Sequence, residues 1–142
     1  MTRIDFYMLK RGTRGDRLTY SCRLAEHIHT NHKLRILIHC PNPREARDLD
    51  RLLWTYRDES FLPHGLVGET DPELTPILIS GDGQPEDEHQ VLINLGTEVP
   101  TFFERFERLC EPLDLRPDIR DAGRKRYIYY RDNGYPLKYH EV

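Results

Sequence analysis

Side chains that could bind an anionic ligand recur at helical spacing near the end of the chain. They are Arg120, Arg124, Tyr127 and Arg131, with Arg116 one turn earlier. In a helix, at about 100° per residue, the first four fall within a sector of roughly 60°. Guanidinium groups form forked, charge-assisted hydrogen bonds with carboxylates and phosphates, and a tyrosine ring adds an apolar surface beside them. The spacing therefore predicts a binding face for a carboxylate-rich or phosphate-bearing ligand.

The rest of the chain is acidic, which sets this basic segment apart. The formal net charge is -3, and residues 58–104 contain eleven Asp and Glu residues but no Lys or Arg. Residues 116–131 instead hold six Lys and Arg residues against two Asp residues, a net charge of +4. A nucleic-acid groove usually needs a broader positive field, so this polarity favours a protein partner.

The alternative for these residues is a solvated helix face that binds nothing. Two features favour a binding face instead. The charges are all Arg, which is less strongly hydrated than Lys. In addition, no Glu stands four residues before or after Arg120 or Arg124 to neutralise it within the helix.

Length and composition predict a single domain over residues 1–142, with 37% apolar residues and an ordinary content of Gly and Pro. No apolar run approaches the ~20 residues that span a bilayer, and the first residues lack the apolar stretch of a signal peptide, so we expect a cytoplasmic protein. Cys22, Cys40 and Cys110 are odd in number and lie in apolar surroundings. They are expected to be reduced thiols in the core.

Hydrophobic patterning predicts strands that alternate with helices. Short apolar runs indicate strands at residues 4–9, 34–40, 76–79 and 91–95, with loops at 60–66 and 81–90. Such all-apolar strands are usually buried on both faces. The pattern therefore predicts a three-layer α/β domain with a mainly parallel central sheet and helices on both sides.

Capping residues delimit the expected helices. The first begins after Asp16 and ends at a left-handed Asn31, and the second begins after Asn42 and ends near Trp54. The last runs from residue 117 to residue 134, where Gly suits a left-handed end. A further helix is expected after Thr101, carrying the apolar side chains Phe102, Phe103, Phe106 and Leu109.

Signatures of a cofactor or of catalysis are missing. The first loop, residues 10–15, has neither the three-glycine dinucleotide pattern nor a Gly-Lys-Ser/Thr phosphate loop. The seven histidines lack the helical spacing of a zinc site, and no nucleophile-elbow motif is present. We therefore expect no cofactor, no metal and no enzymatic activity.

A second group of residues could form a protein interface. Trp54, Phe61 and Leu66 flank a segment in which Pro and Gly interrupt the apolar pattern. They would either pack in the core or form an exposed apolar patch of the kind that marks protein interfaces.

Several short blocks of the sequence carry a further signal. The most specific one joins Leu53-Trp54 to the Ser-Phe-Leu-Pro-His run at residues 60–64. It is accompanied by Phe6-Tyr7, the helix at residues 22–26, Leu49-Asp50, residues 92–95, residues 106–108, and the segment from Arg124 to Tyr135. Taken together, these blocks resemble the chi subunit of bacterial DNA polymerase III holoenzyme, nearly end to end and in the same order.

The resemblance implies a non-enzymatic accessory protein of the clamp-loader complex with a Rossmann-like fold that has lost nucleotide binding. Two partners follow from it. The acidic C-terminal tail of single-stranded DNA-binding protein (SSB) would bind Arg120, Arg124, Tyr127 and Arg131. The psi subunit, which links chi to the clamp loader, would bind around Trp54, Phe61, His64 and Leu66. Nucleic acid would be contacted only indirectly, and no membrane is involved.

Two other functions stay open at this point. In the first, the protein binds single-stranded nucleic acid directly, with phosphates along the Arg residues and bases stacked on Tyr127 and Tyr130. In the second, it is a small nucleotide-dependent enzyme on an α/β scaffold, which the missing glycine motifs disfavour.

Overall fold

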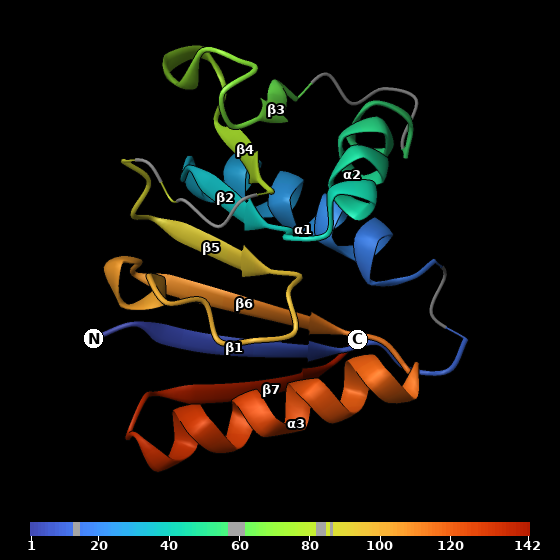
Figure 1. Cartoon of the computed structure of the whole chain (residues 1–142), viewed down its shortest axis with the longest axis vertical. Helices are drawn as coiled ribbons and strands as arrows, with labels where there is room; N and C mark the ends of the chain where they lie inside the picture. The colour runs from blue at the N-terminus through green and yellow to red at the C-terminus, as the bar shows by residue number, and fades with distance from the viewer. Residues whose placement is uncertain (13–14, 57–61, 82–84, 86) are drawn as a thin grey trace.

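One parallel sheet organises the protein. The computed structural model describes residues 1–12, 15–56, 62–81, 85 and 87–142, and in this part of the chain seven strands form a single sheet with three α-helices (Figure 1). The strands are β1 (Arg3–Met8), β2 (Ile36–His39), β3 (His64–Leu66), β4 (Ile77–Ser80), β5 (Val91–Asn94), β6 (Arg108–Leu113) and β7 (Leu137–Glu141). Their order across the sheet is β3-β4-β2-β5-β6-β1-β7, and every pair is parallel. The predicted fold class is confirmed.

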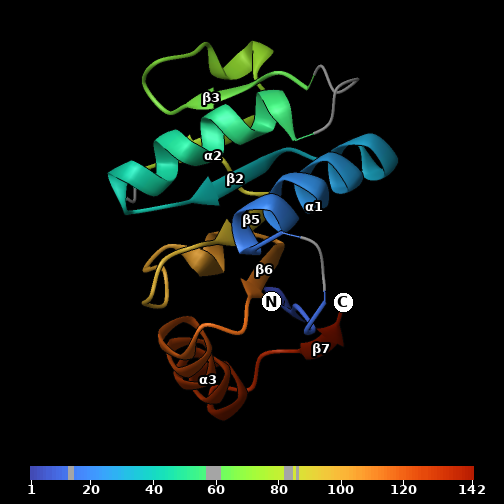
Figure 2. The same ribbon diagram turned by 90° about the vertical axis from the view of Figure 1, so that its right-hand side faces the viewer.

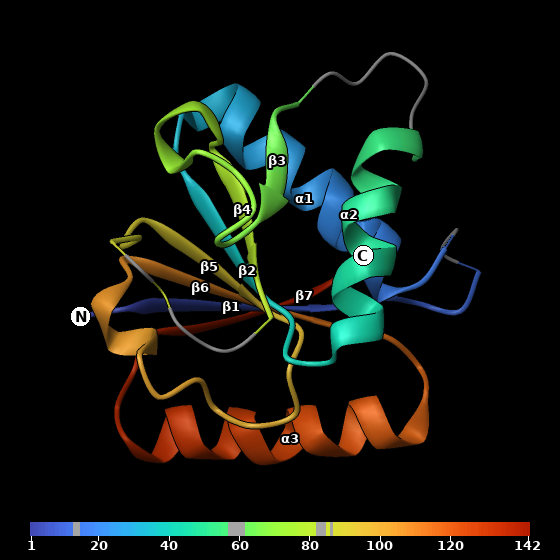
Figure 3. The same ribbon diagram turned by 45° about the horizontal axis from the view of Figure 1, so that its top comes forward.

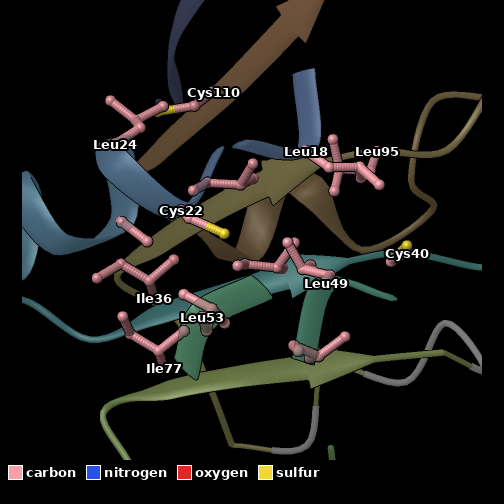
Figure 4. Close-up of a cluster of buried hydrophobic side chains, with 14 of the residues drawn as sticks. Leu18, Cys22, Leu24, Ile36, Cys40, Leu49, Leu53, Ile77, Leu95 and Cys110 are labelled. Carbon is pink, nitrogen blue, oxygen red and sulfur yellow. The ribbon is translucent and has the colours of Figure 1, made fainter. Parts of the chain in front are cut away.

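The helices cover both faces of the sheet, as Figures 2 and 3 show. They are α1 (Arg17–His32), α2 (Pro43–Thr55) and α3 (Pro117–Asp132). Successive strand residues point to opposite faces, so Ile36 and Ile38 join the core beneath α1 and α2, while Leu37 joins the core beneath α3. Figure 4 shows the first of these cores, where α1 and α2 pack on the sheet. The three cysteines are free and buried, as predicted.

The first two helices begin where the sequence predicts. The Asp16 carboxylate accepts hydrogen bonds from the first-turn backbone of α1, and the Asn42 side-chain oxygen does the same for α2. The predicted end of α1 is wrong by two residues. Asn31 stays inside the helix, where its side chain donates to the His27 carbonyl, and Lys33 adopts the left-handed conformation with φ 57°.

The helix predicted after Thr101 is wrong. Phe103–Arg105 forms a single 3-10 turn, and Leu109 lies in strand β6. The three-residue spacing of Phe103 and Phe106 suits a 3-10 turn as well as an α-helix, so apolar spacing alone could not separate the two. Pro112 also obscured the strand, but it lies beyond the last residue pair between β5 and β6, where a missing N–H breaks no pairing.

Besides β6, two further strands were not predicted. The segment expected as a loop at residues 60–66 contains the three-residue strand β3, and the last strand, β7, follows α3. Both lie at the edges of the sheet. Strand β3 is only three residues long and β7 is half-exposed, so neither has the apolar run that marks the central strands. Helix α3 itself ends at Asp132, and Gly134 follows with φ 78°, the left-handed conformation expected of it.

Candidate functional site

Helix α3 carries the predicted anion-binding residues, and a buried ion pair fixes it on the sheet. Glu111 of β6 is fully buried, and both its oxygens accept hydrogen bonds from Arg126 Nε at 3.1 and 3.0 Å. The Tyr130 hydroxyl donates to the same carboxylate at 2.8 Å, and the Asn94 amide donates at 3.1 Å. Burial, followed by the charge of Glu111, raises the pKa of Tyr130 well above its usual range. These contacts set which face of α3 points outward.

Arg126 and Arg116, two of the six basic residues in segment 116–131, already form ion pairs with carboxylates of the protein. Arg126 is buried against Glu111 at 3.0 Å. Arg116 forms a forked pair with Asp114, its Nη2 lying 2.8 Å from the carboxylate and its Nε 3.1 Å from it. The +4 segment thus presents fewer free cations than its composition suggests.

Helix α3 also approaches β6 closely at Gly123. A Cβ placed on Gly123 would lie 2.6 Å from the Leu113 methyl groups, so a larger residue here would have to displace the Leu113 side chain. The residues of α3 that face the sheet are Ile119, Gly123, Arg126 and Tyr130. Because this inward stripe contains a glycine and an arginine, a search for apolar residues alone does not find it.

Three of the four predicted anion-binding residues line one pocket. Arg120, Arg124 and Tyr127 border a cavity of about 280 Å³ between α3 and the ends of β1, β6 and β7. Its remaining walls are mostly apolar and consist of Phe6, Met8, Leu113, Gly123, Ile128 and Tyr139. The Tyr127 ring packs edge-on against Phe6 with 5.2 Å between ring centroids. The site is thus an apolar pocket with two guanidinium groups at its border.

Of the two guanidinium groups, that of Arg124 is the more available to a ligand. Arg124 is exposed, and among the described residues it forms no ion pair. Arg120 forms a long ion pair with Asp121, whose carboxylate lies 3.6 Å from the Arg120 Nε, and this buried Nε has no hydrogen-bond acceptor in the described part of the chain. Arg131 does not line the pocket, and its ion pair with Asp132 is shorter, at 3.1 Å. We therefore centre the site on Arg120, Arg124 and Tyr127.

The apolar walls were not identified from the sequence. Phe6 and Met8 alternate on the first predicted strand, so their shared face could have been predicted. Ile128 follows Arg124 by one helical turn and is also exposed. Tyr139 could not be found, because β7 was not predicted and nothing in the sequence brings it beside β1.

The second predicted site lies at the other end of the sheet (Figure 1). Trp54, at the end of α2, is 55% exposed, and its ring lies over His64 with 4.4 Å between ring centroids. The His64 ring is itself buried, with Nδ1 2.8 Å from the Leu62 carbonyl oxygen and Nε2 3.0 Å from that of Asp50. His64 therefore supports Trp54 from below and offers little surface of its own.

The other two residues of this group, Leu66 and Phe61, give less support to an exposed surface. Leu66 is half-buried on β3 and packs against the core beneath α2. Phe61 lies outside the described residues. The sequence left open whether these residues form an exposed patch or pack in the core. Trp54 is exposed, whereas Leu66 packs partly in the core.

Asp114 occupies the position where many α/β folds of this type bind phosphate. Its carboxylate lies 3.4 Å from the Arg17 backbone nitrogen at the start of α1 and 3.2 Å from the Arg116 backbone nitrogen at the start of α3. Burial alone would raise the pKa of Asp114, but hydrogen bonds from Arg116 outweigh it and lower the pKa. A carboxylate of the protein thus neutralises the helix ends that would otherwise attract an anion.

Other kinds of site find no support in the described part of the chain. No cluster of three or more His, Cys, Asp or Glu side chains there could hold a metal ion. None of its helices combines the length and apolar character needed to cross a membrane.

Comparison with solved structures shows the fold alone. The chain superposes on the structure described as "The crystal structure of T4 UvsW" with a TM-score of 0.68 and 10% identity, covering 99% of this chain and 41% of that one. It also superposes on "Mss116p DEAD-box helicase domain 2 bound to an RNA duplex" with a TM-score of 0.59 and 11% identity, covering 98% and 63%.

Comparison of sequences is more specific. The chain is 38% identical over 143 residues to the protein named DNA polymerase III subunit chi from Pseudomonas aeruginosa, covering all of this chain and 98% of that one. It is 30% identical to the proteins of the same name from Haemophilus influenzae and Escherichia coli, covering at least 96% of each chain. The sequence model of the family described as "DNA polymerase III chi subunit, HolC" matches residues 1–138. The chain therefore belongs to the DNA polymerase III chi subunit family.

Proposed function

We propose that this chain is a non-catalytic adaptor of the cytoplasmic replication machinery, which joins the acidic C-terminal tail of SSB to the clamp loader through the psi subunit. Membership of the chi family supports a place in DNA polymerase III. The observation that carries the adaptor role is the pocket beneath α3, where Arg120 and Arg124 border an apolar cavity.

The chemistry of this pocket matches an acidic peptide that ends in an apolar residue. The terminal side chain would fill the cavity against Tyr127 and Phe6, which excludes water from both. The carboxylates next to it would accept forked hydrogen bonds from Arg120 and Arg124. Each charge-assisted bond contributes ~1.5–3 kcal/mol before the cost of ordering the peptide, so we expect a dissociation constant of micromolar order that rises with salt.

The structure favours this ligand over single-stranded nucleic acid. Base stacking on Tyr130 would require an exposed ring, but this ring is fully buried and its hydroxyl bonds to Glu111. A phosphate track would also need consecutive free cations, whereas Arg116 and Arg131 each lie beside an Asp carboxylate. Two cations beside an apolar cavity suit a short peptide terminus better.

The structure also disfavours the nucleotide-dependent enzyme. Asp114 already supplies the negative charge at the helix ends where a phosphate would bind. A nucleotide phosphate placed there would be repelled by this carboxylate and would have to displace Arg116 from it.

For the psi subunit, we propose a surface centred on Trp54. An exposed Trp held rigidly on a buried His is typical of an interface anchor. This surface and the α3 pocket lie at opposite ends of the strand order, so both partners would bind at once.

A titration with a fluorescent acidic peptide tests the adaptor role. We expect Arg124→Glu to lower peptide affinity at least tenfold. Lys125→Glu makes the same charge change on the next residue, which lines a different cavity beside Asp118 and Asp121, and should change the affinity less than about threefold. Equal effects of both variants would refute the site. Binding of bare single-stranded DNA as tight as that of the peptide would support the nucleic-acid alternative instead.

A further inference from the structure

We propose that the acidic peptide, as it leaves the α3 pocket, pairs as an additional strand with the outer edge of β7. This inference rests on the proposed function, because the peptide is the ligand of that same site. It extends the site from an anchor for the last residues of the peptide to a track for the residues before them.

The hydrogen bonds between β1 and β7 fix which backbone groups face outward. Ile4 N–H donates to the Pro136 carbonyl at 2.9 Å, and Val142 N–H donates to the Met8 carbonyl at 3.0 Å. In a parallel pair, alternate residues of a strand bond to the same neighbour. The even-numbered residues of β7 therefore face β1, and the N–H and C=O groups of Leu137, Tyr139 and Glu141 face away from it.

Among the described strands, β7 is the last of the sheet, and its outer edge pairs with none of them. Figure 2 shows α3 packed on one face of the sheet, to one side of β7, and Tyr139 of this strand is 51% exposed. The strand is also fixed in place: His140 Nε2 lies 3.1 Å from the Asp5 carboxylate, and the His140 ring stacks on Tyr7. A rigid, open edge is a ready template for an extended peptide.

The edge and the pocket meet at Tyr139. Its half-exposed side chain lines the pocket with Arg124 and Tyr127, while its own N–H and C=O face the open edge. A strand added here would lie about 4.8 Å from β7, within one or two residues of the pocket. A peptide anchored in the pocket is thus brought directly to these backbone groups.

Charges around the edge select an acidic peptide. Side chains of an added strand point alternately to the two faces of the sheet. On the α3 face they approach Arg124, and on the opposite face they approach the exposed Lys138. Carboxylates on successive peptide residues would therefore each meet a cation. Glu141 is the exception at the far end of β7, so the acidic residues should lie beside Leu137 and Tyr139.

Backbone N-methylation of the peptide tests this pairing without altering the protein. A series of acidic peptides is prepared, each with one methylated amide, and their affinities are measured by anisotropy. We expect losses of about fivefold or more at alternate residues, whose N–H groups face β7, and little change at the residues between them. If the unmethylated peptide binds and the series shows no alternation, the edge pairing is refuted while the pocket stands. If the unmethylated peptide does not bind, the proposed function itself fails.

Amide hydrogen exchange supplies the matching observation on the protein. In the free protein, the amides of Lys138 and His140 should be protected by β1, and those of Leu137, Tyr139 and Glu141 should exchange rapidly. Saturating peptide should slow the second group at least tenfold. Unchanged exchange of these amides would contradict the inference. If the exchange of these amides slows with rising protein concentration in the absence of peptide, the edge would instead pair with a second copy of this chain.

Discussion

Replacing Arg126 with Met should destabilise the protein strongly, because it leaves a buried charge without its partner. Glu111 is fully buried, and Arg126 is the cation that bonds to both of its oxygens. Removing one member of a buried ion pair typically costs ~3–5 kcal/mol. Typical domains have a free energy of unfolding of only ~5–15 kcal/mol, so this variant should be near the limit of folding.

A double-mutant cycle isolates the pair. Glu111→Gln removes the charge but keeps an oxygen that can accept from the Tyr130 hydroxyl. Combined with Arg126→Met, it should restore at least ~2 kcal/mol relative to Arg126→Met alone, because no isolated charge is then buried. Arg124→Met serves as the matched control on the exposed face and should change the stability by less than about 0.5 kcal/mol.

Urea denaturation followed by far-ultraviolet circular dichroism measures all four variants. The reasoning is wrong if Arg126→Met costs less than about 1 kcal/mol, or if the effects of the two substitutions simply add. Either result would mean that water reaches Glu111 and that another interaction holds α3 in place.

Other consequences of the structure can be tested separately. Trp54→Ala should weaken capture of a psi-type partner at least tenfold in a pull-down while leaving the melting temperature nearly unchanged, since this side chain is half-exposed; wild-type capture would exclude it from the interface. Gly123→Ala should lower peptide affinity, because the added Cβ displaces Leu113, which forms a wall of the pocket. The fold should survive, because the gain of ~1 kcal/mol in helix propensity offsets much of the strain. Unchanged affinity in the anisotropy assay would contradict this. Burial raises the pKa of the Cys22, Cys40 and Cys110 thiols from 9.0 to about 12, so the folded state keeps protons that the unfolded state loses. The contribution of these thiols to the free energy of unfolding in urea should therefore be fully present below pH 9 and be lost as the pH rises from 9 towards 12. A free energy of unfolding that does not fall in this window would show that the thiols are accessible.

The central part of the fold could be predicted from the sequence because its signals are local. The apolar runs of β2, β4 and β5 and the caps at Asp16 and Asn42 each depend on a few neighbouring residues. The edge strands could not be predicted in this way. Strand β7 is half-exposed, and it exists because its backbone pairs with β1, more than a hundred residues earlier in the chain.

The candidate site was predicted only on its helical side. Helical spacing was enough to align Arg120, Arg124 and Tyr127, and the structure places all three at one pocket. The same spacing could not show that Arg131 lies outside it. It also gave no sign that Arg126 is buried, because its partner Glu111 lies on strand β6, which was not predicted.

A charge-swap experiment tests most directly whether the α3 pocket holds an acidic peptide. Calorimetry would compare the wild-type protein and Arg124→Glu, each with the acidic peptide and with a peptide in which the Asp nearest the terminus is replaced by Lys. We predict that each single change weakens binding at least tenfold and that the two changes together recover at least fivefold of the loss. Losses that multiply without any recovery would show that Arg124 does not face the peptide carboxylate, and the account of this pocket would be wrong.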